Sequence, residues 1–238
     1  MHSKIRRSIK KFPNAKQPTG LRRKAASKKP SKRILIVCEG EKSEPIYLRW
    51  LKNIENKMNI EIDIAGEDCD SAPIKVVNYA EARANREGRP ENGGYSEVYC
   101  VIDRDEHADF DRARDRVRQL NSAKSKFAAK SIHLIVSYPC FETWILFHFI
   151  YSRAPIGRSG RYSPGDMATQ KLRREILEFA EYSKSPTKKE LACLTERTEL
   201  AISNSIRAMD DAEKTGEHNP STEMHKLVNK IKSGFSDD

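Results

Sequence analysis

Acidic residues that follow two short apolar runs are the feature of this chain that points most directly to chemistry. Asp103 and Asp105 come just after the apolar run 98–102, and Glu39 follows an earlier run of the same kind at 34–38. In a parallel α/β sheet, the C-terminal ends of the strands form the edge at which ligands bind. We therefore expect these carboxylates to meet at one edge of a sheet.

Carboxylates that are crowded together repel one another unless a cation lies between them, and hard oxygen ligands favour Mg²⁺ or Mn²⁺. Residues two apart in an extended segment point the same way, so Asp103 and Asp105 can reach one ion. Glu39 joins them if the two strands are neighbours. Such a site can hold one or two metal ions, polarise a phosphodiester and stabilise the departing oxygen. Glu142, at a helix start just after a later strand, is a fourth candidate ligand.

The alternative interpretation is structural, because Asp is common after strands as a turn or cap residue. An isolated Asp-x-Asp is a weak metal signal, and Glu142 alone is more often a helix-start charge. The joint occurrence at two strand ends brings the metal interpretation level with the structural one. A phosphate loop is excluded, because Glu41 stands where that loop requires a glycine before Lys42.

The elements that must position these residues alternate between strands and helices. Apolar runs predict strands at 34–38, 60–64, 98–102 and 132–136, and the alternation of Ile with acidic residues places 60–64 near a sheet edge. Helical periodicity predicts helices that begin at Ser43 or Glu44, at Ser71 to Pro73, near Phe110, at Phe141 and at Asn219-Pro220-Ser221. This order predicts an α/β fold with a mostly parallel sheet flanked by helices. Beyond about residue 167 the sequence predicts helices only.

The 238 residues divide into three parts, and charge sets the first of them apart. Residues 1–33 hold 13 of the 44 basic residues and no acidic one; the other 31 stand against 34 acidic residues, a net charge of −3. This basic tail has too few apolar residues to form a core and is expected to be disordered. It is either an arm that tracks phosphates or a solubilising tail. The α/β core spans 34–150, and a basic loop with a helical extension spans 151–238.

Composition excludes several other classes of protein. No apolar run is long enough to span a membrane, and no secretory signal follows the basic N-terminus. The five cysteines have no metal-binding spacing, and Cys38 and Cys100 lie within apolar strands. A reducing cytoplasm is the simplest compartment. The sequence leaves open whether the chain forms a homodimer.

Four segments together resemble the motifs of the RloB-like family, in order and over most of the chain. They are Ile34–Glu44 with Tyr47, Asp103–His107 with Phe110, Ser137–Trp144 with His148-Phe149, and Asn219–Thr222. Tyr138 departs from the usual third motif, in which an Asn stands at that position.

The resemblance implies a Toprim-like domain, a compact α/β fold found in enzymes that cut or join DNA. By that pattern Glu39 is a general acid/base or ligand, and Asp103 and Asp105 are ligands of Mg²⁺. The resemblance also implies an AAA/ABC-type ATPase partner in bacterial anti-phage defence, with this chain as the nuclease that acts on DNA or RNA. Candidate phosphate-binding residues are Lys42, Arg104, Arg158 and Arg161. The alternative is a non-catalytic module that binds nucleic acid or the ATPase through its C-terminal helices.

Overall fold

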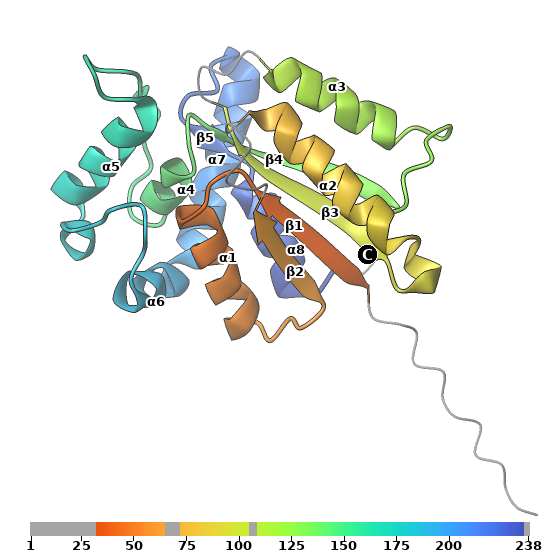
Figure 1. Ribbon diagram of the computed structural model, residues 1–238. Coiled ribbons are helices and arrows are strands. Elements are labelled where there is room, and N and C mark those ends of the chain that lie inside the picture. The colour runs from red at the N-terminus through yellow and green to blue at the C-terminus, as the bar shows by residue number, and fades with distance from the viewer. Residues whose placement is uncertain (1–31, 65–71, 105–108, 236–238) are drawn as a thin grey trace, which may run out of the picture.

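A five-stranded sheet forms the centre of the computed structural model, which describes residues 32–64, 72–104 and 109–235 (Figure 1). The strand order is β2-β1-β3-β4-β5, and all pairs are parallel except β4 with β5. The strands are β1 (Arg33–Cys38), β2 (Ile60–Ile64), β3 (Tyr95–Asp103), β4 (Ser131–Tyr138) and β5 (Ser221–Thr222). The predicted α/β fold with a mostly parallel sheet is confirmed, and so is the position of β2 at an edge.

Helices connect and cover these strands. They are α1 (Ser43–Ile54), α2 (Pro73–Glu87), α3 (Phe110–Leu120), α4 (Glu142–Phe147), α5 (Pro164–Glu175), α6 (Lys188–Glu196), α7 (Thr198–Thr215) and α8 (Met224–Ser233), with short 3-10 turns at Pro90–Asn92 and Leu177–Phe179. The strands of the parallel part all run the same way, so their C-terminal ends face α4 and α5 (Figure 1).

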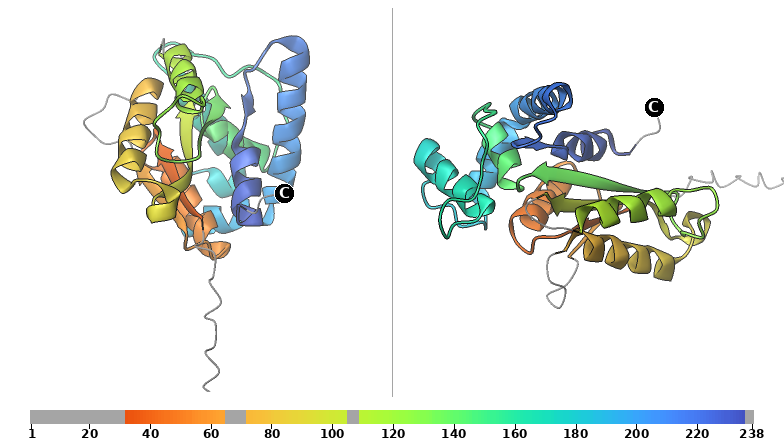
Figure 2. Two further views of the ribbon diagram at one scale, coloured as in Figure 1. Left: turned by 90° about the vertical axis from the view of Figure 1, so that its right-hand side faces the viewer. Right: turned by 90° about the horizontal axis from the view of Figure 1, so that it is seen from above.

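The two faces of the sheet carry separate hydrophobic cores, because successive strand residues point to opposite faces. On one face, Leu35, Val98 and Ile132 pack under α2 and α3. On the other face, Ile34 and Val101 belong to a larger core that includes α1 and all the helices from α4 onwards (Figure 2). The C-terminal helices therefore share a core with the sheet and do not form a separate hydrophobic unit.

Three predicted boundaries were wrong. Residues beyond 167 are not only helical, because Ser221-Thr222 pair with β4, and the Oγ atoms of Ser137 and Thr222 are 2.8 Å apart. The last helix begins at Met224 and not at Asn219, whose side chain instead exchanges hydrogen bonds of 3.0 and 2.9 Å with the backbone of Ile156. In each case a contact with a distant segment replaces the local capping pattern.

The third correction concerns the start of α1. Neither Ser43 nor Glu44 caps this helix: Lys42 stands at the cap without a side-chain hydrogen bond, and both predicted caps are buried in the first turn. β1 begins at Arg33, the last residue of the expected tail, and the preceding Lys32 donates to the Phe235 carbonyl at 3.1 Å. Residues 1–31 of that tail lie outside the described residues.

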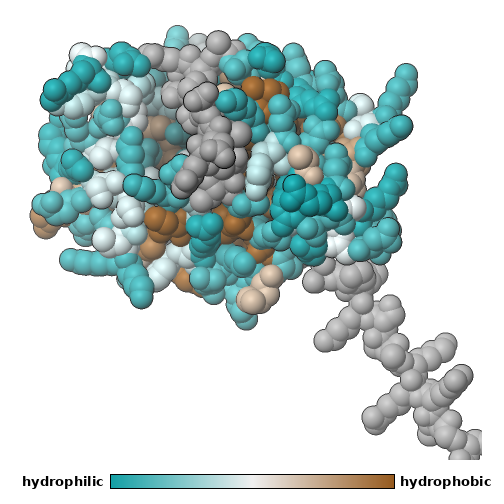
Figure 3. Space-filling model, in the orientation of Figure 1, coloured by the Kyte–Doolittle hydropathy of each residue, from teal (hydrophilic) through white to brown (hydrophobic). Residues whose placement is uncertain are grey.

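Hydrophilic side chains cover most of the face shown in Figure 3, and hydrophobic ones gather only in small patches. Within the part of the chain that the structure describes, no helix combines the length and apolar character needed to cross a membrane.

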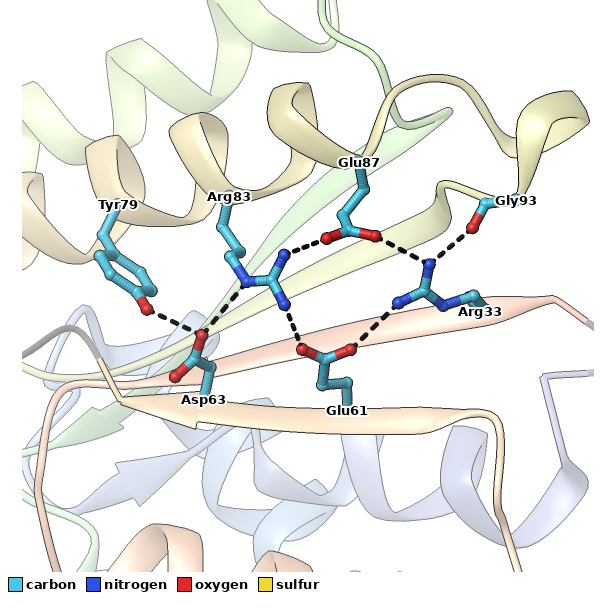
Figure 4. A network of polar contacts seen from close by, with 7 residues as sticks. All are labelled: Arg33, Glu61, Asp63, Tyr79, Arg83, Glu87 and Gly93. Carbon is cyan, nitrogen blue, oxygen red and sulfur yellow. Dashed lines mark hydrogen bonds and ion pairs between the residues drawn. The ribbon is translucent and has the colours of Figure 1, made fainter.

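A network of ion pairs attaches α2 to the edge strand β2 (Figure 4). Arg83 on α2 donates to Glu61 on β2 and to Glu87, each at 2.5 Å, and lies 3.6 Å from Asp63. Arg33 extends the network, with 3.1 Å contacts to both Glu61 and Glu87. Two guanidinium groups thus share two carboxylates. We expect such a network to stabilise the fold more than isolated surface ion pairs do.

We expect Arg83→Met to lower the free energy of unfolding by about 1 to 2 kcal/mol, because Glu61 and Glu87 lose a shared, partly buried partner. The matched control is Arg112→Met, since Arg112 is 72 % exposed and pairs with Asp109 at the surface. Urea unfolding followed by circular dichroism measures both. Equal losses for the two variants would contradict the role assigned to Arg83.

His148 lies in the larger core, where Tyr47 and Trp144 contact its ring edge to face. Its Nδ1 is 2.9 Å from the Trp144 carbonyl, which fixes the proton on that nitrogen. Burial lowers the pKa of His148 to about 4. The folded protein therefore keeps this side chain neutral.

Stability from this group is present above the pKa of an unfolded histidine, about 6.5, and is lost as the pH falls towards the folded value. Between pH 7 and pH 5 the unfolded chain gains a proton that the folded chain does not, at a cost of about 2 kcal/mol. Between pH 7 and pH 5 we therefore expect the free energy of unfolding to fall by about 2 kcal/mol less in His148→Asn than in the wild-type protein. Urea unfolding at several pH values measures the difference, and parallel pH curves would refute it.

Candidate functional site

Glu39 and Asp103 meet at the C-terminal edge of the sheet because β1 and β3 are parallel neighbours in register, with Cys38 beside Val101. The Glu39 N–H continues the pairing by donating to the Val101 carbonyl at 3.0 Å. The Asp103 N–H in turn donates to Oε2 of Glu39 at 3.0 Å. The strand pairing therefore brings the Glu39 carboxylate to the backbone of Asp103, at the edge where these residues were predicted to meet.

Asp105 lies outside the described residues, so its place relative to Glu39 stays a prediction. Among residues 32–64, 72–104 and 109–235, no three or more His, Cys, Asp or Glu side chains group in a way that could hold a metal ion. The described donors nevertheless have the right chemistry for a hard cation, since Glu39 and Asp103 offer carboxylate oxygens at adjoining strand ends. A site with three protein ligands would need a contribution from Asp105.

Glu142 is the first residue of α4 and is only 4 % exposed. Its Oε1 accepts hydrogen bonds from the Ser43 hydroxyl at 3.1 Å and from the Tyr182 hydroxyl at 3.2 Å. Burial raises the pKa of the Cys140 thiol, and the carboxylates of Glu142 and Asp103 raise it further. Glu142 follows β4, which is paired in parallel with β3 so that Asp103 lies beside Ser137, and it therefore belongs to the same edge of the sheet as Asp103.

Glu44 is a buried carboxylate, which the sequence predicted only as a possible N-terminal cap of α1. It is 6 % exposed, and burial, with a smaller effect from the Glu142 carboxylate, raises its pKa to about 7. Its carboxylate packs against Gly40, where an added Cβ would lie 2.3 Å from Oε2. A signal was available, because residue 44 falls on the same helical stripe as Tyr47, Leu48 and Leu51, which face inward.

Lys184 and Tyr182 come from the segment before α6 and also reach this edge. The Lys184 carbonyl oxygen lies 3.0 Å from the Ser43 hydroxyl oxygen, which is also in contact with Glu142. Burial lowers the pKa of Lys184, but the carboxylates of Glu142 and Asp166 outweigh that effect and raise it overall. Lys184 is therefore a cation close to the buried acidic residues, and no sequence pattern marked it.

The four candidate phosphate-binding residues lie in two places. Lys42 is exposed at the start of α1, and Arg104 directly follows β3, where its backbone N–H donates to Ser137 at 2.8 Å. The Arg104 guanidinium stacks over Phe110 at 4.7 Å. Arg158 and Arg161 occupy the exposed tip of the 151–163 loop, beside α5. The first two are thus next to Glu39 and Asp103 in the chain, and the second pair projects from a different element.

These observations define an α/β protein whose mostly parallel sheet gathers acidic residues at the C-terminal ends of its strands. The sequence profile described as RloB-like protein matches residues 34–231, and the chain belongs to this family. The resemblance carried by the four motifs is confirmed. No curated protein and no solved structure matches the chain.

Gly40→Ala tests the packing around Glu44. The new methyl group would overlap a carboxylate that is itself buried, so we expect a loss of about 1 to 3 kcal/mol in the free energy of unfolding. Gly157→Ala is the matched control, because a Cβ there meets no atom within 4 Å. Combining Gly40→Ala with Glu44→Ala should recover part of the loss, and strictly additive effects of the two changes would contradict this packing.

Proposed function

We propose that this protein is a metal-dependent nuclease that hydrolyses phosphodiester bonds of DNA or RNA. The observation that carries the proposal is the hydrogen bond from the Asp103 N–H to Glu39 at the strand ends. It supports a shared role for two carboxylates that the sequence separates by 64 positions. The basic residues beside them are of the type that binds phosphates.

Each acidic and basic residue predicted for the site has a proposed role. Glu39, held by the backbone of Asp103, serves as the general acid/base or as a ligand. Asp103 and Asp105 supply oxygen ligands for Mg²⁺ or Mn²⁺, and Glu142 is a fourth donor from α4. When bound, the ion would polarise the phosphodiester and offset negative charge on it. Lys42 and Arg104 on one side, and Arg158 and Arg161 on the other, would hold the flanking phosphates.

Membership of the RloB-like family supports a wider proposal. We propose that the nuclease is the effector of a bacterial anti-phage defence system and acts in the cytoplasm. An AAA/ABC-type ATPase would restrain or trigger it. The C-terminal helices, on the sheet face opposite α2 and α3, offer surface for such a partner. A basic N-terminal tail would add affinity for nucleic acid without adding sequence preference.

A non-catalytic binding module is the second candidate. It is favoured by the lack, among the residues that the structure describes, of three metal-binding side chains in one group. In that case Glu39 and Asp103 are turn residues, and the basic tail or the C-terminal helices carry the binding. The two candidates differ in whether a divalent cation binds.

Calorimetric titration with Mn²⁺ distinguishes them without the partner ATPase. We expect saturable binding to the wild-type protein and its loss in Asp103→Asn/Asp105→Asn, because the amides remove two negative charges from the site. Glu97→Gln is a control at the opposite end of β3 and should bind as the wild type does. Equal and negligible heats for all three proteins would favour the binding module. If Mn²⁺ binds, a cleavage assay on labelled DNA and RNA follows.

A further inference from the structure

A cavity of about 310 Å³ lies beside α5, between this helix, the end of the 151–163 loop and the segment 183–184. Tyr162, Gln170 and Arg173 line it, together with Thr169 and Lys184. Its volume is at the lower end for pockets that bind small molecules or parts of larger ones. The lining combines one aromatic ring, hydrogen-bonding groups, two cations and the Asp166 carboxylate.

This cavity adjoins the acidic site through Lys184. The Ser43 hydroxyl is 3.0 Å from the Lys184 carbonyl and 3.1 Å from Oε1 of Glu142, so a single side chain separates the cavity wall from a buried carboxylate. Lys184 also lines the cavity, and its ammonium lies 3.4 Å from the Asp166 carboxylate. The cavity and the acidic edge therefore share the segment 182–184, since Tyr182 donates to Glu142 and Lys184 lines the cavity.

Tyr162 lines this cavity and is nevertheless 39 % exposed, so part of an aromatic residue faces solvent here. The Arg161 guanidinium lies 5.2 Å from the centre of its ring and donates to its hydroxyl at 3.2 Å. The turn is closed by backbone hydrogen bonds between Ser159 and Tyr162 of 3.1 and 3.0 Å. The ring is thus held in place by its own turn and offers a face for stacking.

The polar groups in the cavity favour an anionic ligand with hydrogen-bonding edges. Arg173 is anchored by its Nε, which donates to the Tyr182 carbonyl at 2.6 Å. Asp166 is the acidic member of the lining, and its carboxylate is already engaged by the Ser163 backbone and hydroxyl and by Lys184 at 3.4 Å. Gln170 is exposed and adds both a donor and an acceptor.

We propose that this cavity takes one unstacked base of a single-stranded nucleic acid, with Tyr162 as the stacking surface and Arg173 and Lys184 on the adjoining phosphates. The proposal rests on the proposed function and narrows it to single strands. In a duplex, a base could enter only after it is unpaired and unstacked, at a cost of a few kcal/mol. Aromatic stacking tolerates any base, so the site would select strandedness and not sequence.

The test uses fluorescence anisotropy to measure how fluorescent oligonucleotides of about 20 nucleotides bind to the full-length chain in EDTA. Single-stranded DNA, single-stranded RNA and a duplex of the same sequence are compared at moderate salt, which weakens the contribution of the basic tail. Three variants are measured. Tyr162→Ala removes the ring, Tyr162→Phe keeps it, and Met58→Ala is the control for loss of an exposed apolar side chain, since Met58 is 83 % exposed.

We expect Tyr162→Ala to weaken binding of the single strands about tenfold and to leave duplex binding unchanged. Tyr162→Phe and Met58→Ala should bind as the wild type does. Equal losses for single strands and duplex, or no loss for either, would overturn the proposal. Failure of the proposed function looks different: single strands bind in a Tyr162-dependent way, but the wild type cleaves nothing in Mn²⁺.

Discussion

The parallel pairing of β1 with β3 is the constraint on which the rest of the site depends. The register that sets Cys38 beside Val101 also sets the end of one strand beside the end of the other. The Asp103 N–H can then bond Glu39 across the edge, where the next ladder bond would otherwise lie. A slip of one residue would turn these side chains to the opposite faces and separate the pair.

A second layer of acidic residues depends on helices that the sheet alone does not determine. Glu44 and Glu142 are both nearly excluded from water, which is costly for carboxylates unless partners compensate. Ser43 and Tyr182 donate to Glu142, and Lys184 supplies positive charge nearby. These partners come from α1 and from the segment before α6, so the acidic edge joins parts of the chain that are more than a hundred residues apart.

The two arginine-rich parts of the molecule have different physical roles. Arg33 and Arg83 are committed to ion pairs that fasten α2 to an edge strand, on the side of the sheet away from Tyr182 and Lys184. Arg161, by contrast, lies at an exposed turn and holds the ring of Tyr162. Arg33 and Arg83 therefore stabilise the packing of α2, whereas Arg161 lies at the surface beside the ring of Tyr162.

The sequence by itself determined the α/β class, the edge position of β2 and the family, and it placed Glu39 and Asp103 at strand ends, because these follow from local apolar runs, the polar residues that end them and the motifs. That β1 and β3 are neighbours, so that Glu39 meets Asp103, was decided by the tertiary structure. Only the tertiary structure decided that Glu44 is buried, that Ser221-Thr222 form a strand and that Ser43 joins the Lys184 carbonyl to Glu142. The strand at Ser221-Thr222 and the approach of segment 182–184 depend on contacts between distant segments, which leave no periodic pattern in either partner, whereas the burial of Glu44 agrees with its place on the inward stripe of α1. Local preferences for caps and turns gave way to these contacts wherever the two competed.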